Sequence, residues 1–120
     1  MKPAERRQRV ADEIKRVVAE TLQRDIKDFD LTMVTVTRCD LARDYAEATI
    51  RYSVLGDQQT RAACATQLSK VAGFVQKRVA ERIKLYRVPH VRFEFDPSID
   101  ESLKLEKLFD RIARERQDNG

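Results

Sequence analysis

Histidine, cysteine and glycine are scarce in this sequence, and tryptophan is absent. Its 120 residues include one histidine, two cysteines and three glycines. Cys39 and Cys64 form no CxxC pair and have no histidine near them, so neither a disulfide framework nor a zinc site is expected. His90 stands alone beside Pro89 and is interpreted as structural. We therefore expect no bound metal.

Long apolar runs and catalytic motifs are also missing. No apolar run approaches the roughly 20 residues of a membrane span, and the N-terminal MKPAERRQRV contains no apolar signal region. There is no P-loop, no dinucleotide-binding fingerprint and no nucleophile–base arrangement. We therefore expect a cytoplasmic protein that does not contact a membrane, needs no cofactor and is not an enzyme.

The length and composition indicate one globular domain. A chain of 120 residues, of which 42% are hydrophobic and 37% charged, can bury one modest core beneath a densely charged surface. There are no repeats and no low-complexity linker. We expect a monomer with a single domain over residues 1–120, a core over about 4–113 and a frayed tail over 116–120.

Positive charge is concentrated in one part of the chain. Residues 70–92 carry seven basic residues and one acidic residue, a net charge of +6, within a chain whose total is +4. Residues 1–27 carry a net charge of +3, whereas residues 28–69 carry −2 and residues 93–120 carry −3. A basic stripe on an otherwise balanced domain is typical of proteins that bind polyanions.

Hydrophobic periodicity predicts the order α-β-β-α-α-β-α. Helical spacing covers residues 4–27, and strand patterns cover 32–39 and 45–54, which a short polar connection should join as an antiparallel hairpin. A helix follows from about residue 58, and alternation after Pro89 predicts a third strand. A last helix should begin at a capping box over 98–101, with an apolar face of Leu105, Leu108, Phe109 and Ile112. An α+β fold, in which all helices pack on one face of a three-stranded sheet, would bury the apolar faces of these helices and strands.

A glycine interrupts the helix that follows residue 58. On one straight helix from 58 to 85, Phe74 would fall beside the exposed Lys70 and Lys77. Because an interior glycine costs about 1 kcal/mol relative to alanine, we expect a kink at Gly73 that rotates Phe74 into the core and opens an anion site at the start of a second helix. The kink would comprise Val71, Ala72, Gly73 and Phe74. The alternative is that Gly73 only makes room for close packing.

This arrangement resembles a type II KH fold, although the GXXG loop of KH modules is absent. The sequence is also similar, over residues 4 to about 113, to the ribosome-binding factor A family. The similarity is carried by QRDIKD at 23–28, LTMVTVTRCDLARDYAEATI at 31–50, VAGFVQKRVAERIKLYRVPHVRFEFD at 71–96 and SLKLEKLF at 102–109. In this family an Ala-x-Gly kink replaces the GXXG loop, and here Val71 stands at the alanine position.

The resemblance implies a ribosome assembly factor without enzymatic activity. It implies binding to the free small ribosomal subunit and its rRNA, support of late maturation and of 5′-end processing of 16S rRNA, and greatest importance in the cold. Ribosomal proteins and an assembly GTPase are further partners to consider. Two other classes stay open, namely a general nucleic-acid binder and a protein-binding module that docks through its acidic last helix (Asp100, Glu101, Glu106 and Asp110).

The predicted RNA-binding residues are basic side chains on and after the central helix. This primary set consists of Lys70, Lys77, Arg78, Arg82, Lys84 and Arg87, whose charges would hold phosphates without reading sequence. A solvated charged face is the alternative. A secondary set consists of Arg6, Arg7, Arg9, Arg38, Arg43 and Arg51. Tyr45 and Tyr86 could stack on bases, but packing is the more common role of aromatic residues at the ends of elements.

Overall fold

The computed structural model describes residues 1–98 and 108–116. In chain order it contains α1 (Pro3–Glu20), a short π-helical turn η1 (Thr21–Asp25), β1 (Val34–Leu41), β2 (Glu47–Val54), α2 (Gln58–Arg82) and β3 (His90–Phe95). Residues 108–116 form a further helix. The predicted α+β, KH-like class is therefore confirmed, with one long helix, α2, where two shorter ones were expected.

The three strands form one mixed sheet in the order β1-β2-β3. β1 and β2 are the predicted antiparallel hairpin, and β3 returns parallel to β2, so that Ile50 of β2 lies opposite Cys39 on one side and Phe93 on the other. The register of β1 shifts between Val36 and Arg38, which leaves Thr37 as an extra residue. This bulge turns Cys39 and Leu41 toward the same face as Val36.

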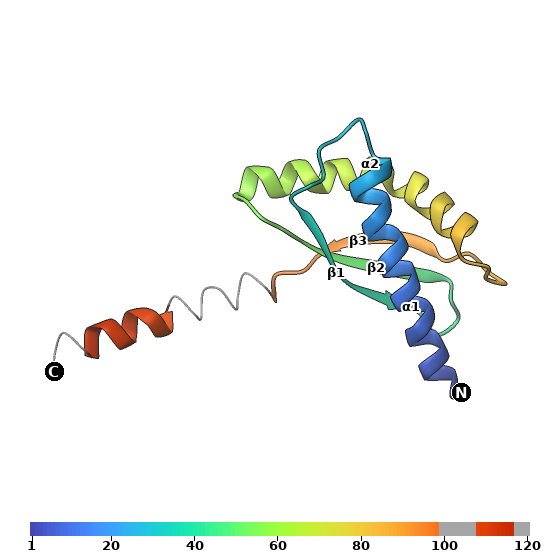
Figure 1. The fold of residues 1–120 in the computed structure, drawn as a ribbon, viewed down its shortest axis with the longest axis horizontal. Coiled ribbons are helices and arrows are strands. Elements are labelled where there is room, and N and C mark those ends of the chain that lie inside the picture. The colour runs from blue at the N-terminus through green and yellow to red at the C-terminus, as the bar shows by residue number, and fades with distance from the viewer. Residues whose placement is uncertain (99–107, 117–120) are drawn as a thin grey trace.

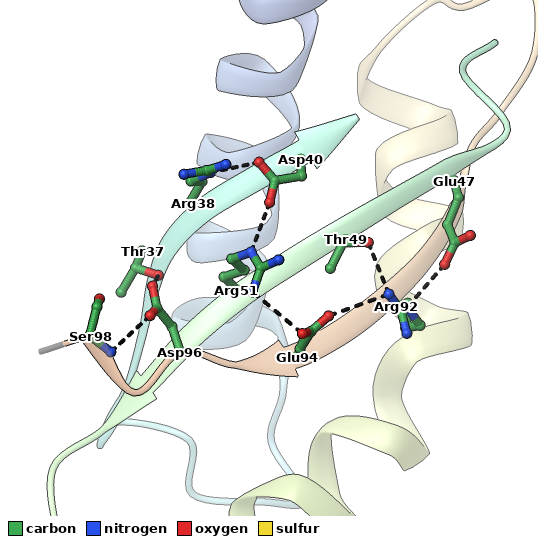
Figure 2. A network of polar contacts seen from close by, with 10 residues as sticks. All are labelled: Thr37, Arg38, Asp40, Glu47, Thr49, Arg51, Arg92, Glu94, Asp96 and Ser98. Carbon is green, nitrogen blue, oxygen red and sulfur yellow. Dashed lines mark hydrogen bonds and ion pairs between the residues drawn. The ribbon is translucent and has the colours of Figure 1, made fainter. Parts of the chain in front are cut away.

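Both long helices pack on the same face of this sheet, as Figure 2 shows from the opposite side. Alternation along β2 and β3 places Ile50, Tyr52 and Val91 on the helix side, where they are buried. The helices complete the core with apolar side chains at i, i+3 and i+4 spacings, among them Ile14, Val17, Val18, Leu68, Val75 and Val79. The other face of the sheet carries polar side chains.

The helix α2 is continuous across Gly73, so the predicted division into two helices is wrong. Its axis bends where it passes behind α1 (Figure 1), but no second helix begins there, and the expected anion site at a new helix start does not form. Phe74 stays 41% exposed instead of entering the core. A Cβ added to Gly73 would meet no atom within 4 Å, so close packing does not explain the glycine either.

The helix over residues 108–116 does not bury its apolar face. Leu108, Phe109 and Ile112 are exposed, and the helix stands apart from the sheet (Figure 1), so the expectation that all helices pack on the sheet is wrong for this one. Leu105, most of the predicted capping box, and the acidic Asp100, Glu101 and Glu106 lie outside the described residues. Asp110 is exposed on this helix.

Candidate nucleic-acid interface

The six basic residues of the primary set lie in two places. Lys70, Lys77, Arg78 and Arg82 are on α2 and form what we term the α2 strip. Lys84 and Arg87 follow the end of α2, in the loop that leads to β3. The helix α2 ends before Ile83, whose backbone is extended, with φ −123° and ψ 120°. The loop that follows ends at the buried Pro89.

Acidic neighbours neutralise part of the α2 strip. Arg78 Nε lies 3.4 Å from Asp25 Oδ2, and Arg82 lies 3.2 Å from Glu20. A second contact of 3.3 Å joins Arg78 to Glu81, one turn along the helix. Lys77, by contrast, has no ion-pair partner within the described residues.

Phe74 is the aromatic residue of this strip. The guanidinium carbon of Arg78 lies 5.2 Å from the centre of its ring, a cation–π geometry. Phe74 lines two hollows, one together with Lys77 and Glu81 and the other together with Lys70 and the segment 25–29. In that second hollow Lys70 Nζ lies 5.8 Å from the ring centre of Phe29. The predicted anchor is therefore a surface residue among cations.

A larger hollow, which we term the basic cleft, lies where three segments meet. It has a volume of about 710 Å³ and is lined by the start of α1, the β1–β2 turn and the loop after α2. Its cationic side chains come from the primary and the secondary sets alike: Arg6, Arg7, Arg43, Lys84 and Arg87. The one acidic side chain in its lining is Asp44. The fold thus brings together residues that are far apart in the sequence.

The β1–β2 turn shapes one wall of the basic cleft. Tyr45 has a φ of 62°, a left-handed conformation that is uncommon for residues other than glycine and that tends to occur at functional sites. The turn is held by hydrogen bonds of 2.9 Å from Tyr45 N to the Ala42 carbonyl and from Ala42 N to the Glu47 carbonyl. Asp44 accepts a hydrogen bond from Ala46 N at 3.0 Å.

The two cleft tyrosines are placed differently. Tyr45 is partly buried and packs against the core, as expected for an aromatic residue beside a strand end. Tyr86 is fully exposed, in the loop between Leu85 and Arg87. Packing therefore accounts for Tyr45 and does not account for Tyr86.

Ion pairs occupy the open face of the sheet, where two residues of the secondary set lie (Figure 2). Asp40 lies 2.6 Å from Arg38 and 2.8 Å from Arg51. Glu94 lies 3.4 Å from Arg51 and 3.3 Å from Arg92, and Arg92 also contacts Glu47 at 2.9 Å. Burial acts to raise the pKa of Asp40, but hydrogen bonds from Arg51 and then Arg38 outweigh it, so that the pKa lies below its usual value. Arg38 and Arg51 thus face carboxylates, and their role in RNA binding stays a prediction.

The remaining secondary residue, Arg9, is exposed on α1 and does not line the basic cleft. Sequence reasoning missed Arg61, whose guanidinium carbon lies 5.2 Å from the ring centre of Phe95, and Arg92, which completes the ion-pair network. It also missed the proximity of Arg43 to Lys84 and Arg87 around the cleft. Except for the pair of Arg92 and Glu94, which are neighbours on one face of the same strand, these contacts depend on how distant segments pack, so no local pattern could have revealed them.

Neither a metal centre nor a membrane span is found in the described ranges. Within residues 1–98 and 108–116 no group of three His, Cys, Asp or Glu side chains could hold a metal ion. Cys39 and Cys64 are both free thiols and both buried, and burial raises the pKa of Cys39 to about 12. No helix in these ranges is long and apolar enough to cross a bilayer.

Comparison with known proteins gives consistent matches. The family model described as Ribosome-binding factor A matches residues 6–109. Ribosome-binding factor A from Thioalkalivibrio sulfidiphilus is 34% identical over 110 residues, which cover 92% of this chain and 85% of that protein. A solution structure of a Thermotoga maritima protein superposes with a TM-score of 0.68 at 29% identity, over 78% of this chain and 90% of that one.

One further match comes from work on a ribosomal particle. It is a homology model of Thermus thermophilus ribosome binding factor A, fitted into a cryo-EM map of a 30S–RbfA complex. They superpose with a TM-score of 0.60 at 21% identity, over 72% of this chain and 91% of that one. At this level of identity the match shows a shared fold.

Proposed function

The chain belongs to the ribosome-binding factor A family, and from this premise we propose that it binds the free small ribosomal subunit and supports its late maturation. In keeping with this, a homology model of the Thermus relative has been fitted into a cryo-EM map of a 30S–RbfA complex. We further propose that the chain acts in the cytoplasm as one domain, without catalysis, and supports 5′-end processing of 16S rRNA.

The observation that carries this proposal is the pair of basic surfaces at the middle and the end of α2. All six residues of the primary set belong to the α2 strip or the basic cleft, where they are exposed to solvent or line a hollow. Lysine and arginine side chains of this kind bind phosphates, which supplies affinity and position without reading the sequence of the RNA. Specificity for the small subunit would then arise from the shape of the rRNA, which the protein would contact through its folded surface.

Sedimentation with purified ribosomal particles tests the proposal. The protein should migrate with free small subunits, migrate little with complete ribosomes, and be released as salt is raised, because phosphate contacts are salt-dependent. Lys77→Glu combined with Arg82→Glu should abolish co-migration. Arg114→Glu combined with Arg116→Glu, the same change of charge on the exposed helix 108–116, serves as the control and should leave it intact.

The opposite pattern would overturn the proposal. Co-migration that ignores salt and survives the Lys77→Glu, Arg82→Glu change would exclude electrostatic binding to rRNA. Equal affinity for arbitrary RNA would instead identify a general nucleic-acid binder. For the finer claim, a strain that lacks the protein should accumulate small-subunit rRNA with an unprocessed 5′ end, and the wild-type gene should restore the mature length.

A further inference from the structure

The cations of the basic cleft outnumber its one carboxylate and have no ion-pair partner among the described residues. None of its five cationic side chains forms an ion pair with a carboxylate within the described part of the chain. Its one acidic side chain, Asp44, already accepts a hydrogen bond from Ala46 N at 3.0 Å. By contrast, Arg38, Arg51 and Arg92 on the open sheet face all contact carboxylates. A concave surface that carries five cations and one carboxylate favours an anion that carries several charges.

The position of Tyr86 indicates which class of anion the cleft would bind. Its ring is fully exposed in a loop between residues that line the cleft, and it makes no aromatic contact within the described residues. Phosphate groups alone would need no aromatic neighbour, whereas a nucleobase stacks readily on a tyrosine ring. The cleft volume of about 710 Å³ falls in the range of roughly 300–1,000 Å³ found for pockets that hold small organic groups.

The cleft is larger than the hollows of the α2 strip, and this difference in size distinguishes two forms of RNA. In an A-form duplex the bases are stacked inside, and the protein meets phosphates and a shallow minor groove. The α2 strip, whose hollows measure only about 190 and 270 Å³, suits contacts with such a backbone. A base can stack on an exposed tyrosine ring beside a hollow only where it is unstacked from its neighbours, in a loop, a bulge or a single-stranded segment.

We infer that the basic cleft binds a single-stranded segment of RNA, with one base stacked on Tyr86 and the flanking phosphates held by Arg6, Arg7, Arg43, Lys84 and Arg87. This inference rests on the proposed function and deepens it, because it states which form of RNA this surface recognises. The tyrosine supplies stacking, which tolerates any base, and the cations supply the salt-dependent part of the affinity.

Two RNA probes and three variants of the full chain test the inference. The probes are a labelled oligouridylate of about eight nucleotides, within the usual site sizes for single strands, and a blunt-ended RNA duplex without a loop, compared at equal concentrations of phosphate. Tyr86→Ala should weaken binding of the oligouridylate about 5- to 150-fold, the range expected for loss of one stacked base. Tyr86→Phe keeps the ring and should bind within about twofold of wild type. Both variants should bind the duplex as wild type does.

Phe109→Ala is the matched control, because Phe109 is an exposed aromatic residue that lies in neither the basic cleft nor the α2 strip. It should leave oligouridylate binding unchanged. A glutamate peptide of equal charge tests the cations alone and should bind more weakly than the oligouridylate, with no dependence on Tyr86. Because Tyr86 is fully exposed, its variants should unfold at the wild-type temperature, which a thermal melt verifies.

Three results would overturn the inference: equal binding of oligouridylate by Tyr86→Ala and wild type, preference of the wild-type chain for the duplex, or tighter binding of the glutamate peptide. Each can be separated from failure of the proposed function. If the wild-type chain still migrates with free small subunits while Tyr86→Ala binds oligouridylate normally, the cleft inference fails and the assembly role stands. If the wild-type chain does not migrate with small subunits at all, the proposed function fails, whatever the short probes show.

Discussion

Arg78 lies over the ring of Phe74, with its guanidinium carbon 5.2 Å from the ring centre. The two residues are one turn apart on α2, and Arg78 is also held by Asp25 at 3.4 Å and Glu81 at 3.3 Å. The ring therefore supports a cation of the α2 strip instead of filling the core. An arginine positioned in this way loses less conformational freedom when it binds a phosphate, because part of its ordering has already occurred.

Replacement of Phe74 should have little effect on stability. Because the ring is 41% exposed, we expect Phe74→Ala to lower the free energy of unfolding by less than about 1 kcal/mol, in the range of an exposed cation–π contact. Val75→Ala, at the adjacent and completely buried position, should lower it by about 2 kcal/mol. Urea denaturation of the two variants measures the difference. A loss of about 3 kcal/mol or more from Phe74→Ala would instead mark the ring as part of the core.

Alanine at position 73 should stabilise the protein. The added methyl group would meet no atom within 4 Å, and alanine is favoured over glycine inside a helix by about 0.5–1 kcal/mol. Gly56→Ala is the control, because Gly56 has a φ of +152° and an added Cβ would lie 3.0 Å from the side chain of Thr60; this change should destabilise. Urea denaturation tests both. A loss of stability from Gly73→Ala would mean that the bend of α2 requires glycine.

Stability should fall at alkaline pH partly because of Cys39. Burial in the sheet, and secondarily the charges of Asp40 and Asp12, raise the pKa of this thiol to about 12, against about 8.5 in an unfolded chain. A raised pKa stabilises the fold below about pH 8.5. This contribution is then lost as pH rises toward 12, because the unfolded chain releases a proton that the folded chain retains, with a slope approaching about 1.4 kcal/mol per pH unit.

Cys39→Val replaces the titratable thiol with an apolar side chain of similar size. The difference in unfolding free energy between wild type and variant should be constant from about pH 6 to 8 and should shift in favour of the variant from about pH 9 to 10. Urea denaturation across this range provides the measurement. Cys64 is retained in both proteins, so its contribution cancels. A difference that does not change with pH would show that the folded thiol ionises as it does in the unfolded chain.

The alternation of β2 and β3 could be predicted from the sequence because their side chains repeat with a period of two. Ile50, Tyr52 and Val91 are buried as expected. The break at Gly73 was wrongly predicted from one residue, although Leu68, Val75 and Val79 keep helical spacing on both sides of it. One interior glycine costs about 1 kcal/mol, whereas a broken helix leaves several backbone groups without partners. The continuous, bent helix is therefore the less costly arrangement.

The long-range pairing of charges could not be predicted from local patterns, unlike a pair such as Arg78 with Glu81, which lie one turn apart on a helix. Arg51 meets Glu94 because β3 returns parallel to β2, and this contact depends on the register of strands that are distant in the sequence. The basic cleft likewise forms only when the start of α1, the turn around Arg43 and the loop around Arg87 come together. Sequence identified these cations as candidates, but the fold decides which of them are neutralised.

This distinction between paired and unpaired cations leads to a direct test on rRNA binding. Lys77 and Lys84 have no ion-pair partner in the described ranges, whereas Arg38 and Arg92 contact Asp40 and Glu94. The double changes Lys77→Ala with Lys84→Ala, and Arg38→Ala with Arg92→Ala, remove the same charge. If phosphates contact the unpaired cations, only the lysine pair should matter.

Salt dependence measures this difference. Each phosphate contact contributes about 0.7–0.9 to the slope of log affinity against log salt, so the lysine double variant should bind small-subunit rRNA with a slope smaller by about 1.4–1.8 between about 50 and 200 mM salt. The arginine double variant should keep the wild-type slope, because its side chains are occupied by carboxylates at 2.6 and 3.3 Å. Equal reductions in the two variants would mean that rRNA competes successfully for the paired arginines. The open sheet face would then join the α2 strip and the basic cleft as part of the interface.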